Sequence, residues 1–345
     1  MNKYTVGKAT QGLANYILKN NPDGRKMGVA IAYDSRNMSP EFAEMSALVL
    51  NANGIKSYVF DELRPTPELS YAVRALGCTA GIVVTASHNP PEYNGYKVYW
   101  ADGAQVVAPK DKGIISEVNA ITDFADIKTM TKREAEEAGL FNIIGKEIDD
   151  GFIQNIKAQA VRPEEVKKAE DMVIVYTPLH GTGNKPVRRV LKEIGFKNVY
   201  VVPEQEMPDG NFSTVGYPNP EDPKAFTLAI ELAKEKNADI VVGTDPDADR
   251  IGVVIKDADG NYDVLTGNMT GALLTEYVLN GRKCFITNAG EAKYYTTVVM
   301  TDKSKGNKGM SILVIPADAP GFSIGKHEKK MGIRGSATYE LIFQD

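Results

Sequence analysis

The amino-acid sequence predicts an α/β protein, with two consecutive mixed, mostly parallel α/β domains followed by a β-rich C-terminal segment. Three observations support this prediction. Strand-like apolar runs alternate with helix-like segments over residues 1–148, and the alternation restarts over residues 149–278. Over residues 279–345, strand-like runs follow one another without a helix of ordinary length between them.

The first predicted domain combines β-branched apolar runs with segments in which apolar residues recur at helical spacing. Pro40 and Pro67 stand near two helix starts, where proline is tolerated because the first N–H groups of a helix have no internal partner. The stretch 128–147 is charged and weakly apolar, and we expect a linker there. The expected strands are 27–33, 56–60, 81–85 and 96–100, and the expected helices are 5–18, 40–51 and 66–76.

The same patterns of apolar residues predict the helices and strands of the second domain and of the C-terminal segment. Asp222 and Pro223 are expected as the N-cap and first residue of a helix that ends at Asn237. The expected strands of the second domain are 172–176, 198–202 and 239–242. Those of the C-terminal segment are 283–288, 294–301, 310–316, 322–326 and 338–343, joined by short turns that carry Gly, Lys or Pro.

Composition narrows the class of protein. Forty Lys and Arg against 45 Asp and Glu give a net charge of −5, and no basic block is present, so we expect no nucleic-acid partner. No apolar run approaches the roughly 20 residues that span a bilayer, and the N-terminus lacks the apolar core of a signal peptide. Two cysteines far apart in the sequence fit a reducing compartment. We expect a cytoplasmic protein without a membrane partner.

A polar loop after a buried strand is the most informative feature. Residues 85–90, Thr-Ala-Ser-His-Asn-Pro, directly follow the apolar run 81–84. Ligands of open α/β sheets bind at the carboxyl ends of strands, which places Ser87 at such an edge beside the imidazole of His88. The Asn-Pro-Pro sequence behind it stiffens the turn. A nucleophilic or phosphorylated hydroxyl and a polar turn that contains serine by chance are both compatible with this pattern.

A second apolar run ends in a loop that carries Asp245, Asp247 and Asp249. Alternate side chains of an extended loop face the same way, so the three carboxylates would converge, and a cation between them would relieve their repulsion. Oxygen ligands near an anionic substrate indicate Mg²⁺. A calcium hand is disfavoured because Arg250 and Lys256 replace its Gly and Glu, and zinc because no Cys/His cluster exists. The alternative is a solvated acidic turn.

Together these loops resemble those of the α-D-phosphohexomutases, the phosphoglucomutase and phosphomannomutase family. Residues 85–97 are similar to the family's phosphoserine loop and residues 243–250 to its metal loop. Residues 176–183, Tyr-Thr-Pro-Leu-His-Gly-Thr-Gly, resemble the strand-to-helix turn that opens its second domain. Two further family-like loops are 208–212 and 218–221. The resemblance covers roughly residues 1–278 and implies the first two domains of the family.

The resemblance implies a phosphosugar mutase that interconverts hexose 1-phosphate and 6-phosphate through a phosphoserine and a bisphosphate intermediate. Ser87 would carry the phosphoryl group and join the three aspartates as a Mg²⁺ ligand, with a hexose 1,6-bisphosphate as activator. Lys97 matches the family's candidate proton-transfer residue, and His88 would act in the site with it. Arg250 and His180 would contact the substrate. The alternatives are a solvated lysine for Lys97, a positioning role for His88 and a structural role for His180.

The last segment resembles another family. Residues 277–288 and 329–341 are similar to the middle β-domain of the acyl-CoA dehydrogenases, and we expect the junction at 276–281. Phe285, Ile286 and Thr287 match flavin-lining residues there, but the rest of the flavin site has no match, so FAD is not expected. The mutase family's Gly-Leu-Arg-Gly, sugar-binding and distal phosphate loops have no match either. We therefore expect a mutase fragment that binds Mg²⁺, with weak or absent isomerisation.

Two other functions fit parts of the pattern. An aspartate-nucleophile phosphatase also places an Asp-x-Asp sequence after an apolar strand, but it usually has Thr or Val where this chain has Asp249. A non-catalytic module would bind phosphosugar or metal without forming a phosphoenzyme. A flavin acyl-CoA dehydrogenase is the least favoured. The sequence leaves open the oligomeric state and the choice between glucose and mannose phosphate.

Overall fold

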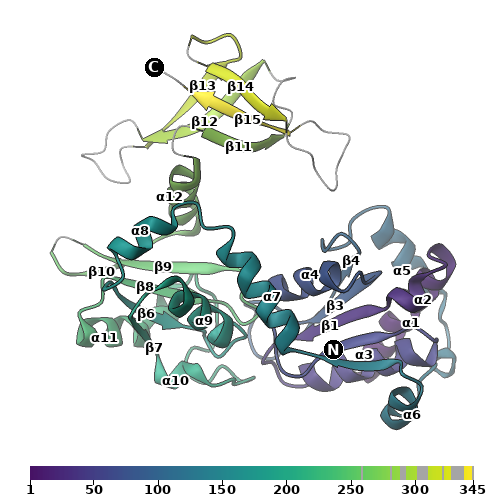
Figure 1. Cartoon of the computed structure of the whole chain (residues 1–345). Helices are drawn as coiled ribbons and strands as arrows, with labels where there is room; N and C mark the ends of the chain where they lie inside the picture. The colour runs from purple at the N-terminus through teal and green to yellow at the C-terminus, as the bar shows by residue number, and fades with distance from the viewer. Residues whose placement is uncertain are drawn as a thin grey trace. The chain divides into compact units, whose positions relative to one another are not determined.

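The computed structural model describes residues 1–257, 259–279, 282–287, 293–300, 310–320, 322–327 and 338–343. By packing, the chain divides into two compact units, Met1–Val264 and Leu265–Asp345. The first unit contains two α/β domains, each built around a five-stranded sheet (Figure 1). The predicted α/β class is confirmed.

The first sheet has the strand order β4-β3-β1-β2-β5. Strands β1, β2, β3 and β5 run parallel, and β4 is antiparallel to β3. The strands are β1 (Val29–Tyr33), β2 (Ser57–Phe60), β3 (Ala80–Val84), β4 (Tyr96–Trp100) and β5 (Phe141–Ile144). The helices are α1 (Lys3–Asn20), α2 (Gly24–Met27), α3 (Ser39–Ala52), α4 (Thr66–Ala75), α5 (Lys110–Ala120), the 3₁₀ helix η1 (Phe124–Asp126) and α6 (Lys132–Glu137).

Alternate residues of the central strands serve two different cores. Ile31 and Ile82 pack on one face of the sheet with the apolar side chains of α1 and α3. Ala32 and Val83 pack on the other face with those of α4. This two-sided burial explains why β1 and β3 read as continuous apolar runs, as strands covered on both faces do.

The stretch 128–147 is not only a linker. It contains α6 and β5, and β5 pairs in parallel with β2 at the edge of the sheet. In β5, Phe141 is buried and Ile143 is exposed, as expected of an edge strand covered on one face. The strand is short, and charged residues precede and follow it. The composition of the whole stretch therefore predicted a linker and not a strand.

The second sheet has the strand order β10-β9-β8-β6-β7. Strand β6 is parallel to β7 and β8, whereas β9 and β10 return antiparallel, so the sheet is mixed. Its strands are β6 (Val173–Thr177), β7 (Asn198–Val201), β8 (Ile240–Thr244), β9 (Ile251–Lys256) and β10 (Tyr262–Val264). The helices are α7 (Lys146–Lys157), α8 (Pro163–Lys168), α9 (Asn184–Ile194), α10 (Pro203–Glu206), η2 (Pro223–Phe226) and α11 (Thr227–Lys236).

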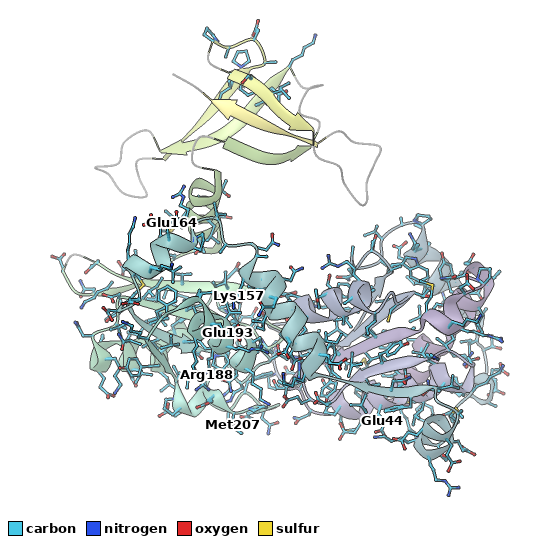
Figure 2. The ribbon with its side chains drawn as sticks, viewed as in Figure 1. Glu44, Lys157, Glu164, Arg188, Glu193 and Met207 are labelled. Atoms are coloured by element: carbon cyan, nitrogen blue, oxygen red, sulfur yellow. The ribbon has the colours of Figure 1, made fainter. Side chains whose placement is uncertain are left out.

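Helix α7 contacts both domains of the first unit. It packs against α4 of the first domain and α9 of the second. Its residues Ile148 and Ile153 are buried. Nζ of Lys157 lies 3.0 Å from Oε2 of Glu193 on α9, and Figure 2 shows the two side chains. The helix therefore joins the domains through packing as well as through the chain.

The second unit contains α12 (Gly267–Leu279) and antiparallel strands. Its two sheets have the orders β11-β15-β14 and β12-β13. The strands are β11 (Arg282–Thr287), β12 (Tyr294–Met300), β13 (Met310–Pro316), β14 (Phe322–His327) and β15 (Thr338–Phe343), which confirms the expected strands. Most of the dehydrogenase-like segment 329–341 lies outside the described residues. Packing places residues 265–278 in this unit, whereas the sequence grouped them with the second domain.

None of the helices described by the structure is both long enough and apolar enough to cross a membrane.

Candidate active site and metal site

The two loops singled out by the sequence meet within the first unit. The serine loop, residues 85–95, follows β3, and the aspartate loop, residues 244–250, follows β8. Oγ of Ser87 donates a hydrogen bond of 2.9 Å to Oδ2 of Asp245. Ser87 has φ of 52°, in the left-handed region that side-chain-bearing residues rarely adopt, and such conformations concentrate at functional sites. The hydroxyl of one domain therefore faces the carboxylates of the other.

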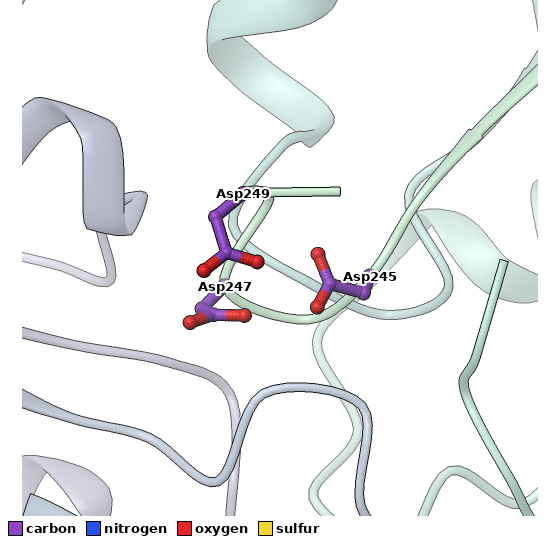
Figure 3. Close-up of side chains that lie close together, drawn as sticks. All are labelled: Asp245, Asp247 and Asp249. Atoms are coloured by element: carbon purple, nitrogen blue, oxygen red, sulfur yellow. The ribbon is translucent and has the colours of Figure 1, made fainter. Parts of the chain in front are cut away.

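The three aspartates form one oxygen-donor cluster (Figure 3). One carboxylate oxygen from each of Asp245, Asp247 and Asp249 lies within 4.8 Å of the others. Asp245 and Asp247 are fully buried. Burial, followed by the charges of Asp247 and Asp249, raises the pKa of Asp245 to about 8. Oδ1 of Asp247 is buried without a hydrogen-bond partner. Three converging carboxylates, two of them buried and one with an unsatisfied oxygen, fit a hard divalent cation.

The other oxygen of Asp247 is held by the first domain. Nζ of Lys97 lies 3.0 Å from Oδ2 of Asp247 and 3.9 Å from Oδ2 of Asp249. Thr66 donates to the same Oδ2 at 2.9 Å, and its N–H donates to the Asp247 carbonyl at 2.9 Å. Burial disfavours the charged form of Lys97, but the two carboxylates outweigh it and the pKa of Lys97 is raised. These contacts leave Oδ1 free to face the cluster.

Thr66 is a site residue that the sequence analysis missed. It is buried at the start of α4, directly after Pro65. The sequence indicates a helix start here, but nothing in it indicates that the first residue of the helix meets a loop of the other domain. A threonine at a helix start next to proline is a common capping pattern, so the local sequence did not separate this role from ordinary helix initiation.

His88 lies beside the serine hydroxyl. Its Nδ1 is 3.2 Å from Oγ of Ser87, and its ring contacts the ring of Tyr217 with centroids 6.0 Å apart. Burial and the neighbouring Arg250 charge lower the pKa of His88. A neutral imidazole at this distance can accept the proton of the hydroxyl.

Arg250 ends the aspartate loop. Its backbone N–H donates to Oδ1 of Asp245 at 3.1 Å, which fixes the orientation of that carboxylate. The side chain is exposed, and within the described residues no ion pair holds its guanidinium. The guanidinium is therefore available to an anionic ligand near the cluster.

His180 occupies a different position. It is buried, its Nδ1 lies 2.9 Å from the carbonyl oxygen of Met207, and its Nε2 lies 2.8 Å from Oγ1 of Thr214. Both ring nitrogens are thus engaged with the loop that runs from 207 to 214. The contacts support the structural alternative that the sequence left open, and substrate contact by His180 stays a prediction.

A substitution separates these two roles of His180. We expect His180→Ala to lower the free energy of unfolding by about 1–3 kcal/mol, because it removes a buried side chain together with its two polar contacts to the 207–214 loop. Thr214→Val should reproduce part of that loss, and the double variant should show coupling, measured by denaturant unfolding. A changed half-saturating concentration of phosphosugar with unchanged stability would instead support substrate contact.

The turn that delivers Thr66 is anchored by charge. Arg64 Nε lies 2.8 Å from Oδ1 of Asp149 on α7, and Nη2 lies 3.0 Å from Oδ1 of Asp61. Glu68, four residues after Arg64, is buried; its Oε1 has no hydrogen-bond partner in the described part of the chain and lies 4.0 Å from Nε of Arg64. Burial, followed by hydrogen bonding to Asp149, raises the pKa of Glu68 to about 9. Glu68 is therefore protonated in the folded protein at neutral pH.

Glu68 makes stability depend on pH. Its pKa is about 9 in the folded state against 4.5 ordinarily, so only the unfolded chain loses the proton between these values. Its stabilising contribution is complete below pH 4.5 and is lost as pH rises toward 9. We expect Glu68→Gln to remove this loss and to gain at least about 1.4 kcal/mol at pH 8, the value of one pKa unit. Denaturant unfolding at pH 5 and 8 measures it, with exposed Glu231→Gln as control. A wild-type protein equally stable at both pH values would contradict it.

The site thus brings together most of the residues predicted from the sequence. Ser87, His88 and Lys97 of the first domain lie against the three aspartates of the second, and Arg250 adjoins them. His180 lies under the 207–214 loop instead. Such a constellation of hydroxyl, imidazole, amine and clustered carboxylates is typical of phosphoryl-transfer proteins.

Comparisons with known proteins agree with this constellation. Residues 1–124 match the family model described as phosphoglucomutase/phosphomannomutase, alpha/beta/alpha domain I, and residues 150–260 match domain II. Residues 253–345 match the acyl-CoA dehydrogenase middle domain. A probable phosphomannomutase of Haemophilus influenzae is 38% identical over 281 residues, 81% of this chain and 55% of the relative. A phosphoglucomutase of Staphylococcus epidermidis is 39% identical over 278 residues, 80% of this chain and 49% of the relative.

A solved structure shows the same fold. A phosphoglucomutase/phosphomannomutase family protein from Burkholderia thailandensis matches with a TM-score of 0.60 and 24% identity, over 81% of this chain and 55% of its own. The chain therefore belongs to the phosphoglucomutase/phosphomannomutase family through its first two domains. It spans about half the length of the curated relatives it matches. Its C-terminal residues match the dehydrogenase domain, as the sequence predicted.

Proposed function

We propose that the first unit transfers a phosphoryl group between Ser87 and a hexose phosphate, the central reaction of a phosphosugar mutase. The observation that carries this proposal is the 2.9 Å contact between Oγ of Ser87 and Oδ2 of Asp245. It joins a hydroxyl on a strained backbone to a carboxylate cluster suited to a divalent cation. The mutase relatives at 38–39% identity support the same class of reaction.

The proposed reaction is a displacement at phosphorus. Oγ of Ser87 forms a bond to the phosphorus of a hexose 1,6-bisphosphate, and the bond from that phosphorus to the sugar oxygen breaks. The serine hydroxyl gives up one proton and the leaving sugar oxygen takes up one, so charge and atoms balance. Isomerisation would need a second transfer: phosphorylated Ser87 gives its phosphoryl group to the free hydroxyl of a hexose monophosphate, and the resulting bisphosphate turns over and returns its other phosphoryl group to Ser87, with one proton moving from the attacking hydroxyl to the leaving oxygen each time.

Side chains of this site can handle both protons. Nδ1 of His88, 3.2 Å from Oγ, is placed to receive the proton of Ser87. Lys97, whose Nζ lies 3.0 Å from Oδ2 of Asp247, would give a proton to the sugar oxygen and attract the phosphate. Arg250, exposed beside the cluster, would bind phosphate oxygens or orient a carboxylate.

Mg²⁺ would be held by Asp245, Asp247 and Asp249, together with an oxygen on Ser87. When bound, it neutralises charge on the phosphoryl group in transfer. The protein groups around it contribute orientation, because Thr66 and Lys97 fix one oxygen of Asp247 and leave the other directed to the cluster.

The direct test is a phosphopeptide map after incubation of the purified protein with glucose 1,6-bisphosphate and Mg²⁺. We expect phosphate on Ser87, and we expect the label to be absent when Mg²⁺ is chelated. An unlabelled Ser87 in a folded protein would overturn the proposal. Metal and phosphosugar binding in calorimetry without any label would instead support the non-catalytic binding module.

Weak or absent isomerisation is a further proposal. It rests on the dehydrogenase-like C-terminal residues, which match none of the sugar-reading loops of the mutases. The expected result is Ser87 labelling without turnover of glucose 1-phosphate above background. Robust formation of hexose 6-phosphate would contradict it.

The free, buried Cys78 fits the cytoplasmic location that we also propose.

A further inference from the structure

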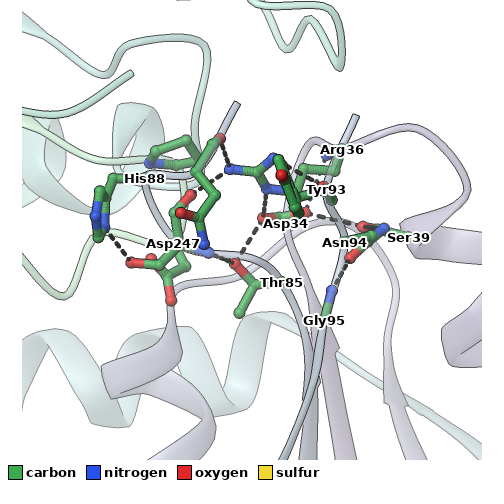
Figure 4. A network of polar contacts seen from close by, with 12 residues as sticks. Asp34, Arg36, Ser39, Thr85, His88, Tyr93, Asn94, Gly95 and Asp247 are labelled. Atoms are coloured by element: carbon green, nitrogen blue, oxygen red, sulfur yellow. Dashed lines mark hydrogen bonds and ion pairs between the residues drawn. The ribbon is translucent and has the colours of Figure 1, made fainter. Parts of the chain in front are cut away.

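Arg36 lies at the centre of a polar network under the serine loop (Figure 4). It follows β1, and its side chain is fully buried. Nη1 donates to the carbonyl oxygens of Pro90 and Tyr93 at 2.8 and 2.9 Å. Nη2 donates to those of Ser87 and Asn89 at 2.6 and 2.5 Å. A single guanidinium therefore binds four backbone carbonyls of one loop, including that of the serine itself.

Asp34 forms an ion pair with the same guanidinium. Its Oδ2 lies 3.2 Å from Nε of Arg36, which has no hydrogen-bond partner among the described residues, and accepts a 2.7 Å hydrogen bond from Oγ1 of Thr85. Its Oδ1 accepts from Oγ of Ser39 at 2.9 Å and from the backbone N–H of Arg36 at 3.0 Å. The carboxylate thus neutralises the buried guanidinium and ties the turn after β1 to the first residue of the serine loop.

The second domain covers the guanidinium. The ring centroid of Phe212 lies 4.9 Å from Cζ of Arg36, a cation–π distance. Nδ2 of Asn37 donates to Oδ1 of Asn211 at 2.8 Å. At Gly210 a Cβ would lie 2.6 Å from the backbone nitrogen of Asn37, so this close approach needs glycine. The N–H groups of the Arg36 guanidinium therefore bind the serine loop, while the flat face of the same group contacts Phe212 of the second domain.

We propose that Arg36 is a positioning residue that holds Ser87 in its left-handed conformation and directs Oγ to the aspartate cluster. A residue at φ of 52° persists only when its surroundings over-determine it. Here the carbonyl of the strained residue and three carbonyls after it bind one planar group. A lysine keeps the charge but cannot reach four oxygens in a plane from a single nitrogen. This inference rests on the proposed function of Ser87 and adds the residue that aims it.

The test compares Arg36→Lys with Arg25→Lys, the same change at an exposed arginine. The rate of Ser87 phosphorylation is measured against glucose 1,6-bisphosphate concentration, and Mg²⁺ affinity by calorimetry. For Arg36→Lys we expect a saturating rate about 100-fold lower, the cost of a displacement near 1 Å. The half-saturating concentration and Mg²⁺ affinity should change far less than the rate, because the guanidinium of Arg36 hydrogen-bonds to backbone carbonyls and not to the three aspartates. A saturating rate equal to wild type in the folded variant would overturn the inference.

Two further measurements keep the test decisive. Guanidinium ion, added at low concentration to Arg36→Ala, should restore labelling where sodium ion does not, which a purely structural defect would not show. Asp34→Asn with Arg36→Gln removes both buried charges and provides a variant without an uncompensated one. Its saturating labelling rate should fall as that of Arg36→Lys does. A wild-type rate in this variant, or no rescue by guanidinium, would overturn the inference.

Backbone hydrogen exchange separates this inference from the proposed function. The N–H groups of Asn89 and Tyr93 bond within the serine loop, to the carbonyls of Ala86 and Pro90. In Arg36→Lys they should exchange faster than in wild type, with α11 unchanged as an internal control. This readout needs no phosphorylation. If wild-type Ser87 is never labelled, the proposed function fails, whereas unchanged exchange at 89 and 93 overturns the role of Arg36.

Discussion

Ser87→Ala should abolish labelling by glucose 1,6-bisphosphate, with a loss of at least about 10⁴-fold, the scale seen when a catalytic nucleophile is removed. The hydroxyl is the only group in the described site that carries a nucleophilic oxygen on a strained backbone beside the carboxylate cluster. Its removal deletes the atom that forms the bond to phosphorus. The measurement is phosphate incorporation followed by peptide mapping.

The matched control for Ser87→Ala is Ser70→Ala. Ser70 lies on α4 of the first domain, and its Oγ donates to the carbonyl oxygen of Gly103 at 2.6 Å. Its loss should leave labelling unchanged. Full labelling or phosphate release in Ser87→Ala would instead support an aspartate-nucleophile phosphatase, in which the serine plays no part.

Asp247→Asn should weaken Mg²⁺ binding by at least about 100-fold, the upper range for loss of a residue that only supports a metal ligand. Oδ1 of Asp247 is the buried oxygen without a partner, and Oδ2 is fixed by Lys97 and Thr66, so this carboxylate is both available and oriented. An amide supplies one oxygen and no charge, which leaves two aspartates to neutralise the cation. Calorimetric titration with Mg²⁺ measures the loss.

The same variant should lose stabilisation by the metal. A ligand that binds only the folded state stabilises it by about 2.7 kcal/mol at 100 times its Kd. Wild type should therefore melt at a higher temperature with Mg²⁺ than with a chelator, and Asp247→Asn should not. Asp263→Asn, at an exposed position of β10, is the control and should behave as wild type. Equal Mg²⁺ affinity of Asp247→Asn and wild type would show that the cluster does not hold the cation through this residue.

Much of the fold could be predicted because its signals are local. Strands β1, β3, β6 and β8 are short apolar runs that end in polar residues, and their ends place both loops at sheet edges. Strand β5 was not predicted, because four residues between charged segments are too few to show the alternation of apolar and polar residues typical of a strand. Strands β9 and β10 were not predicted either, although β9 (Ile251–Lys256) carries an apolar, β-branched run; β10 (Tyr262–Val264) has only three residues.

The sequence by itself determined which chemical groups the site contains. Ser87 with His88, and the three aspartates at alternate positions, stand in runs of neighbouring residues, and such patterns need no knowledge of distant contacts. Lys97 was predicted from the resemblance of residues 85–97 to the family's phosphoserine loop. These groups are fixed by covalent order, so a short stretch of chain is enough to identify them.

Only the tertiary structure decided how these groups are oriented. The contact between Ser87 and Asp245 joins residues 158 positions apart, and that between Thr66 and Asp247 joins residues 181 apart. Arg36 reaches the carbonyl of Ser87 across 51 positions. No local pattern encodes such contacts. The first two depend on how the two domains pack together, and the third on the pairing of β1 with β3 in the first sheet, which brings the Asp-x-Arg turn after β1 next to the serine loop after β3.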